Sequence, residues 1–130
     1  MVKLRVMLVG LLDATAQALA GQGHEITALP DAISALRRAR TTTADVVILD
    51  LAGVDGDPFD LALGIRENTL WRKPMFLVLA DSNTRTLDER CREACIDLIF
   101  YKPVDPGQIL GFLDRLQGIV QDFESFDPVI

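Results

Sequence analysis

The chain has 130 residues, of which 49% are hydrophobic and 25% are charged, which suits one folded domain and is too apolar for a disordered segment. Its formal net charge of -6 excludes the basic surface of a nucleic-acid binder. Its apolar runs are far shorter than the ~20 residues that cross a bilayer. We therefore expect a cytoplasmic protein with one domain over residues 1–123 and a C-terminal tail or linker remnant over residues 124–130.

Two short apolar runs, residues 4–9 and 46–49, predict strands that are buried on both faces. Both are rich in bulky or β-branched residues that do not alternate with polar ones. Between them, residues 13–23 predict a helix that ends at glycines. Residues 24–29 predict a second short strand, and His24 at its start is interpreted as a surface histidine.

A helix is predicted over residues 32–40, directly after the second strand. Asp31 is expected to cap it, because an aspartate side chain accepts hydrogen bonds from the first free N–H groups of a helix. Ile33, Leu36 and Arg40 follow the spacing of an amphipathic helix.

The second half of the chain continues the alternation of strands and helices. After the strand that ends at Asp50, a loop of glycines and aspartates leads to a helix over residues 59–67, with Pro58 in its first turn. Its apolar face is assigned to Phe59, Leu61, Leu63 and Ile65. The last elements are a strand at 74–80, a helix at about 84–95, a strand at 97–101 and a helix after Asp105.

Five short strands that alternate with helices predict a doubly wound α/β fold of (βα)5 type. We expect a five-stranded parallel sheet in the flavodoxin-like order 2-1-3-4-5, in which a crevice opens beyond the carboxyl ends of the first and third strands. Asp50 stands at that crevice.

Two charged residues at the carboxyl edge of this sheet are candidates for chemistry. Asp50 is either a turn residue or a carboxylate held at the crevice. Lys102 follows the fifth strand, and it is either a lysine whose stem covers apolar surface or an ammonium that pairs with a phosphoryl oxygen.

Several segments resemble the receiver domain of bacterial response regulators. They are VVILDL with Asp50, the stretch DPFDL, YKPVDPGQIL and GHEITALPDAISALRRAR. The resemblance covers roughly residues 4–117. It implies that Asp50 is the phosphoacceptor, that Lys102 contacts the phosphoryl group, and that Pro103 is a candidate for a cis peptide bond.

The chain departs from the family where two acidic residues would hold a divalent metal after the first strand. Gly10, Leu11 and Leu12 stand there. Asp50 with Asp55 and Asp57 remain as candidate ligands, but one carboxylate alone is a poor magnesium cage. We therefore expect no cofactor, with Mg²⁺ bound only if the site is competent.

Two further departures concern the response to phosphate that the family shows. Leu79 and Ala80 stand where the family carries a serine or threonine, and neither side chain donates a hydrogen bond. Ile99 stands at the place of the family's switch aromatic. Cys91 and Cys95 lack the other ligands of a zinc site and are interpreted as unpaired thiols.

The last helix is unusually apolar, which predicts a partner surface. The residues assigned to that surface are Ile109, Phe112, Leu113, Leu116, Ile119 and Val120. The resemblance implies that the partner is a histidine kinase or an output domain, or a second copy bound through helix four, strand five and helix five, and we expect no binding of nucleic acid or membrane.

These observations favour a degenerate receiver that is not an enzyme and acts through protein contacts in phosphorelay signalling. The alternatives are a fully competent Mg²⁺-dependent phosphoreceiver and a small flavodoxin-like enzyme or nucleotide-binding domain. The crevice offers such an enzyme only Asp50 and Lys102.

Overall fold

The computed structural model describes residues 4–10, 17, 20–21, 23–52, 57–67, 74–81, 85–102 and 105–125, without the side chains of residues 106 and 117–125. Its centre is one five-stranded parallel sheet in the order β2-β1-β3-β4-β5. The strands are β1 Arg5–Val9, β2 Glu25–Leu29, β3 Val46–Asp50, β4 Met75–Ala80 and β5 Leu98–Tyr101. The predicted fold class and strand order are confirmed.

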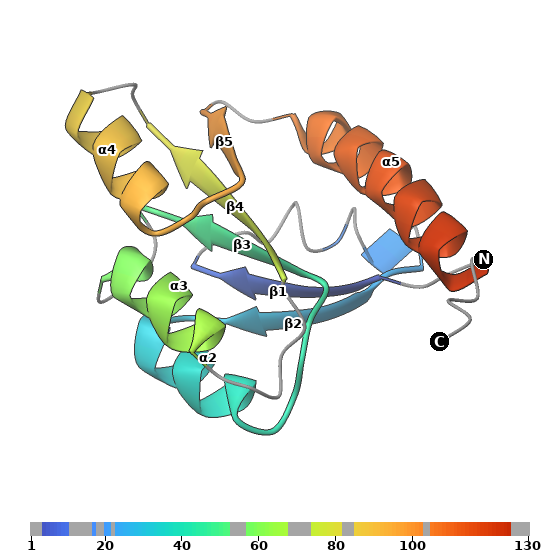
Figure 1. Ribbon diagram of the computed structural model, residues 1–130, viewed down its shortest axis with the longest axis horizontal. Coiled ribbons are helices and arrows are strands. Elements are labelled where there is room, and N and C mark those ends of the chain that lie inside the picture. Colours follow the sequence, from blue (N-terminus) through green and yellow to red (C-terminus); the bar gives the residue numbers. More distant parts are fainter. Residues whose placement is uncertain are drawn as a thin grey trace.

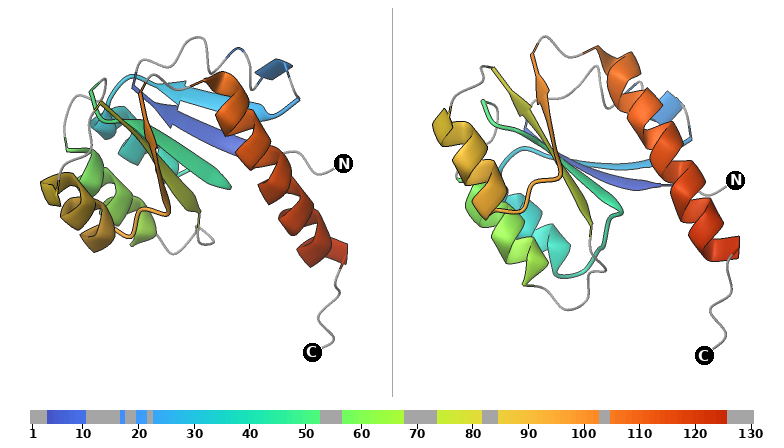
Figure 2. Two further views of the ribbon diagram at one scale, coloured as in Figure 1. Left: turned by 90° about the horizontal axis from the view of Figure 1, so that it is seen from above. Right: turned by 45° about the horizontal axis from the view of Figure 1, so that its top comes forward.

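Helices cover both faces of the sheet (Figures 1 and 2). They are α2 Ala32–Ala39, α3 Pro58–Arg66, α4 Arg85–Glu93 and α5 Pro106–Ser125. α2, α3 and α4 lie on one face, and α5 crosses the other face. Within the described residues, no helix combines the length and the apolar character needed to cross a membrane.

The predicted bounds of these elements agree with the structure to within one or two residues. Of the helix predicted over residues 13–23, only residues 17, 20, 21 and 23 are described, and residues 17, 20 and 21 are helical. α5 continues to Ser125, past the predicted domain end at residue 123. Residues 126–130 lie outside the described residues.

The strands read as continuous apolar runs because both faces of the sheet are buried. Alternate side chains of β1, β3 and β4 pack on the α2 and α3 side, among them Met7, Val47 and Phe76. Their neighbours Leu8 and Ile48 pack on the α5 side. The core therefore has two layers, and the loops at the strand ends are left to carry polar groups.

The first turns of α2 and α3 agree with the sequence predictions. The Asp31 side chain accepts a hydrogen bond from the Ser34 N–H at 2.7 Å, and Pro58 occupies the first turn of α3. The helix after Asp105 begins in a similar way, because the Gly107 N–H donates to the Asp105 carboxylate at 3.0 Å. These bonds satisfy N–H groups that have no partner inside the helix.

The assigned faces of two helices need correction. α2 buries Ala32, Ala35 and Ala39, whereas Ile33 is 69% exposed. α3 buries Phe59, Leu61, Ala62 and Ile65, whereas Leu63 is 41% exposed. Residue 63 lies about 160° around the helix axis from residue 61, because each residue turns the helix by about 100°. The sequence prediction placed Leu63 on the core face, and that placement is wrong.

His24 was also placed wrongly, because its side chain is buried. It precedes β2, whose first residue Glu25 donates its N–H to the Leu4 carbonyl at 2.9 Å. That bond draws the start of the strand against β1. The histidine is therefore part of the packed end of the sheet rather than a surface residue.

Candidate functional site

The ends of β3, β4 and β5 meet at one edge of the sheet and position the candidate residues. Asp50 pairs in register with Leu79, and Ala80 pairs with Tyr101. The hydrogen-bond ladder continues past the strands, because Lys102 N–H donates to the Ala80 carbonyl at 2.8 Å. Asp50 and Lys102 are thus fixed through the backbone on either side of β4.

Asp50 and Lys102 form an ion pair at this edge. Lys102 Nζ lies 2.7 Å from Asp50 Oδ1, which also accepts the Ala52 N–H at 3.1 Å. Asp50 is only 4% exposed. The hydrogen bond to Asp50 raises the pKa of Lys102, outweighing the desolvation that lowers it. A buried carboxylate needs such a partner, because an unpaired buried charge is costly.

A second carboxylate, which the sequence analysis did not single out, faces the same ammonium. Asp81 Oδ1 lies 3.7 Å from Lys102 Nζ, and the Asp81 side chain is exposed. Its position directly after β4 is the signal that could have found it, since the carboxyl ends of parallel strands share one edge. Within the described part of this edge, one cation therefore serves two carboxylates.

The described residues do not fit a magnesium ion at this site. Gly10 follows β1, where it offers no side-chain ligand, and Asp55 lies outside the described residues. Asp50 already binds Lys102. No group of three or more acidic, histidine or cysteine side chains that could hold a metal occurs among the described residues. Magnesium favours a near-octahedral set of oxygens, and the described side chains at this edge do not supply such a set.

Asp57, a candidate metal ligand in the sequence analysis, caps a helix instead. Its carboxylate accepts the N–H groups of Phe59 at 2.9 Å and Asp60 at 3.4 Å at the start of α3. Arg90 of α4 lies 3.0 Å from the same carboxylate. These donors occupy the oxygens that a metal would need, and the assignment of Asp57 as a ligand is not supported.

Apolar, packed residues stand where receiver domains have the serine or threonine and the aromatic residue that respond to phosphate. Leu79 and Ala80 at the end of β4 are each 2% exposed. Ile99 packs toward α4, in a cluster with Phe59 and Cys91. None of these side chains can donate a hydrogen bond to an added phosphoryl group.

The partner surface predicted on α5 is partly wrong. Ile109 and Leu113 have no exposed surface, because they pack on β1, β3 and β4. Phe112 and Leu116 are partly buried against the same cluster. The side chains of Ile119 and Val120 lie outside the described residues. In the described part of α5, the apolar residues therefore serve mainly the core.

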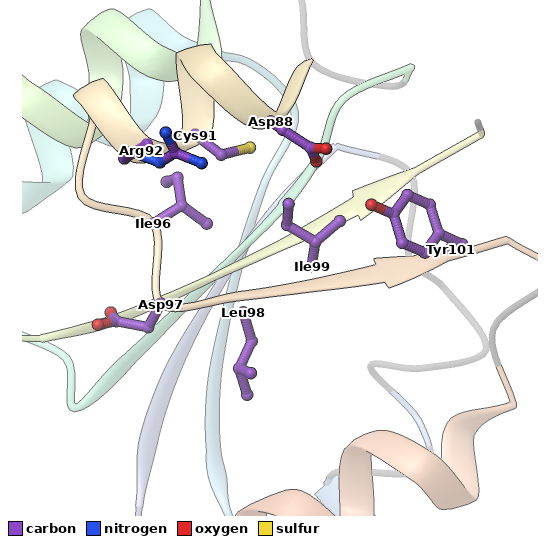
Figure 3. A pocket seen from close by; sticks show the side chains of 8 residues that line it. All are labelled: Asp88, Cys91, Arg92, Ile96, Asp97, Leu98, Ile99 and Tyr101. Carbon is purple, nitrogen blue, oxygen red and sulfur yellow. The ribbon is translucent and has the colours of Figure 1, made fainter. Parts of the chain in front are cut away.

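The exposed apolar surface near this helix lies on β5 instead. Leu98 and Tyr101 are both exposed, at 37% and 40%. A groove runs between β5 and α4, and Ile99 and Tyr101 point into it toward α4 while Leu98 points away (Figure 3). The lining residues are Asp88, Cys91, Arg92, Ile96, Asp97, Leu98, Ile99 and Tyr101.

Two groups in this groove bind their protons more tightly than usual. Burial raises the pKa of the Cys91 thiol, and the neighbouring Asp88 carboxylate adds to that effect. Partial desolvation also raises the pKa of Tyr101, again with Asp88 contributing. Both side chains are therefore neutral at physiological pH. Cys91 and Cys95 are free thiols, as expected.

The order and direction of the strands define the class of fold. The five-stranded parallel sheet in the order β2-β1-β3-β4-β5 has the fold of CheY-like response regulator receiver domains. The sequence itself matches no protein-family model and no curated protein.

Solved structures of receiver domains are similar to this chain over most of its length. The CheY-like receiver domain protein from Methanospirillum hungatei JF-1 superposes with a TM-score of 0.78 at 17% identity, covering 97% of this chain and 100% of that one. Chemotaxis response regulator CheY4 of Vibrio cholerae gives a TM-score of 0.76 at 20% identity, covering 88% of this chain and 98% of its own.

A third similar structure is the receiver domain of a sensor histidine kinase from Pseudomonas aeruginosa PAO1. Its TM-score is 0.73 at 20% identity, and the match covers 88% of this chain and 97% of that domain. That structure has a magnesium ion coordinated in its active-site cleft. At these identities the comparisons establish the fold.

Proposed function

We propose that the chain is a receiver-type domain in two-component phosphorelay signalling, and that it is an atypical one. Asp50 is the candidate phosphoacceptor, its metal-dependent phosphorylation is weak or absent, and the domain acts by binding a protein. The observation that carries the proposal is the 2.7 Å pair of Asp50 and Lys102 at the carboxyl edge of the sheet, in a fold shared with receiver domains.

The charges at this edge support weak phosphorylation. Phosphoryl transfer depends on positioning the group and on cancelling the charge of its equatorial oxygens. Lys102 is the one cation paired with Asp50 among the described residues, and Asp81 competes for it at 3.7 Å. A divalent metal would supply the missing positive charge, but the described side chains offer it no ligand set.

The charged residues at this edge also support a non-enzymatic role. An acyl- or group-transfer enzyme needs a nucleophile, a base and donors that stabilise the developing charge around one point. The described edge supplies Asp50, Asp81 and Lys102, which are engaged with one another. We therefore propose a binding module rather than a catalyst.

The groove between α4 and β5 is the surface we assign to a kinase or output-domain partner. It combines the exposed ring of Tyr101 with the carboxylate of Asp88 and the guanidinium of Arg92. Aromatic and arginine side chains are enriched in protein interfaces. This surface replaces the α5 residues that the sequence analysis assigned, since the core takes Ile109 and Leu113.

Incubation with acetyl phosphate and Mg²⁺, followed by intact mass measurement, tests the proposal. We expect little or no addition of one phosphoryl group to the parent chain, and none to the variant Asp50→Asn. The matched variant Asp81→Asn removes the competing carboxylate 3.7 Å from Lys102. It should raise any residual Asp50-dependent labelling.

Fast and complete labelling of Asp50 would overturn the atypical assignment and establish a competent Mg²⁺-dependent receiver. A magnesium titration followed by NMR gives an independent reading, with no chemical-shift change at Asp50 expected. Flavin or nucleotide absorbance that accompanies the purified protein would instead support the reading as a small flavodoxin-like enzyme.

A further inference from the structure

Two neighbouring helices each expose one large apolar side chain to solvent. Ile33 on α2 is 69% exposed and Leu63 on α3 is 41% exposed. Single exposed apolar residues are ordinary on a protein surface and need no explanation. The charged residues around these two side chains are arranged in a pattern that indicates a binding surface.

On α2, the exposed stripe is basic. Arg37 and Arg40 follow Ile33 by four and seven residues, a spacing that puts all three on one side of a helix. All three side chains are exposed. Among the described residues, neither guanidinium forms an ion pair. In a chain with a net charge of -6, this stripe is a local reversal of sign.

On α3, the exposed stripe is acidic. Asp60 precedes Leu63 by three residues, and Glu67, the C-cap residue, follows it by four, so the three again share one side of the helix. Both acidic side chains are exposed, and neither carboxylate has an ion-pair partner in the described ranges. The side of α3 opposite its core face is therefore acidic around one apolar residue.

The two stripes lie next to each other on the same side of the sheet. A Cβ atom added to Gly64 of α3 would lie 2.8 Å from Leu36 Cδ2 of α2, so the two helices pack closely. Figures 1 and 2 show them side by side. Each connects parallel strands in the same sense, so both helices run opposite to the strands and parallel to each other.

We propose that this surface binds a second copy of the chain about a two-fold axis. We call it the α2–α3 face and define it by Ile33, Arg37, Arg40, Asp60, Leu63 and Glu67. A two-fold axis that lies in the interface and runs parallel to both helices places α2 of one copy against α3 of the other, with the two helices pointing in the same direction. The basic stripe of each copy then meets the acidic stripe of its partner, and every contact occurs twice.

The pattern of charge on the α2–α3 face favours a second copy of the chain over other partners. The acidic stripe repels a nucleic acid or an acidic peptide, and the basic stripe repels a basic one. A second copy presents both signs in the complementary places. Exposed ion pairs contribute little each, and the face is small. We therefore expect a weak, rapidly exchanging dimer with a dissociation constant on the order of 10–100 µM, which weakens as salt is added.

Charge reversal followed by mixing tests the pairing. In Arg37→Glu/Arg40→Glu both stripes are acidic, and in Asp60→Arg/Glu67→Arg both are basic. Sedimentation equilibrium should show dimers of the parent chain and at least a tenfold weaker association of each double variant. An equimolar mixture should restore association to about the parent level, because each acidic stripe again meets a basic one.

The control is Arg38→Glu, which reverses a charge on α2 about 140° around the helix from Ile33, since Arg38 lies five residues further on. It should associate like the parent. The proposal is overturned if the parent stays monomeric into the millimolar range, if the two double variants dimerise as the parent does, or if their mixture does not recover. Far-UV circular dichroism and urea midpoints check that every variant is folded.

The test is independent of the phosphoreceiver proposal, because it involves neither Asp50 nor the groove between α4 and β5. Tyr101→Lys, which alters that groove, should leave the sedimentation result unchanged. Loss of association in this variant would assign the dimer to the groove and overturn the role of the α2–α3 face.

Discussion

The guanidinium of Arg90 lies 3.0 Å from a carboxylate oxygen of Asp57 and 4.3 Å above the centre of the Phe59 ring. Asp57 is also the N-cap of α3, where its oxygens accept backbone N–H groups. One side chain of α4 is thereby fixed to the beginning of the helix that follows Asp50. This contact joins α4 to the edge that carries the candidate site.

Removing the Asp57 side chain should destabilise the fold more than removing the Arg90 side chain. Asp57→Ala loses the helix cap and the ion pair, and we expect it to lower the free energy of unfolding by about 1–2 kcal/mol. Arg90→Ala loses the ion pair and the contact with the Phe59 ring, which amounts to about 1 kcal/mol. Urea unfolding of the two single variants and the double variant gives the coupling energy, expected at roughly 0.5–1 kcal/mol.

Arg85→Ala is the matched control for this cycle. Arg85 is 94% exposed and pairs with Glu89 one turn along α4, at 3.4 Å. Such pairs contribute only about 0.3 kcal/mol. Additive effects of Asp57→Ala and Arg90→Ala would show that the contact joining α4 to α3 carries no energy of its own.

Lys102→Met should leave the Asp50 carboxylate buried without its cation. The Asp50 side chain is 6% exposed and that of Lys102 is 30% exposed, so water compensates only part of the loss. We expect the free energy of unfolding to fall by about 1–3 kcal/mol at neutral pH. A variant as stable as the parent at neutral pH would show that the pair contributes nothing.

The difference in stability between the parent and Lys102→Met at alkaline pH follows from the direction in which the pKa of Lys102 is shifted. Its pKa is raised above the ordinary value of 10.5, chiefly by the hydrogen bond to Asp50, so the folded state holds the proton more tightly than the unfolded state. The stabilisation is complete below the unfolded-state pKa and is lost as the pH rises through the folded-state pKa. The parent's advantage over Lys102→Met should be constant from about pH 6 to pH 9 and decline above pH 10.5.

The strand order and the central ion pair could be predicted from the sequence for a simple reason. Strands buried on both faces are continuous apolar runs, and the residues that follow parallel strands share one edge of the sheet. Asp50 and Lys102 follow β3 and β5 in this way, and their 2.7 Å contact confirms that they meet.

The rotation of the short helices could not be predicted in the same way. α2 buries three alanines and leaves Ile33 exposed, because its small side chains allow close packing that a count of apolar residues does not register. The role of Asp57 was hidden for another reason. Its partner Arg90 is 33 residues away, and an acidic loop residue has the same local pattern whether it caps a helix or binds a metal.

Two helix glycines give different expectations for substitution by alanine. At Gly111 in α5 an added Cβ meets nothing within 4 Å, so Gly111→Ala should stabilise the fold by about 0.5–1 kcal/mol through helix propensity. At Gly64 the added Cβ would lie 2.8 Å from Leu36 Cδ2, so the gain should be reduced or reversed. Equal urea midpoints for the two variants would contradict the close packing of α2 and α3.

Cys95 ends α4 in a backbone conformation that favours glycine, with φ at 58°. Its N–H donates to the Arg92 carbonyl, and the next N–H, of Ile96, donates to the Cys91 carbonyl. These are the two hydrogen bonds of a Schellman cap, in which glycine usually takes the left-handed position. The Cβ atom of Cys95 therefore strains a cap that is otherwise complete.

Replacing this residue should relieve the strain without loss of packing, because Cys95 is exposed. We expect Cys95→Gly to raise the free energy of unfolding by about 0.5–1 kcal/mol, less than the full left-handed cost because glycine also gains freedom when unfolded. Urea unfolding under reducing conditions measures the change. Cys95→Ala keeps the Cβ atom and loses only the thiol, so it should match the parent. If alanine stabilised the fold as much as glycine does, the thiol and not the backbone conformation would be the cause.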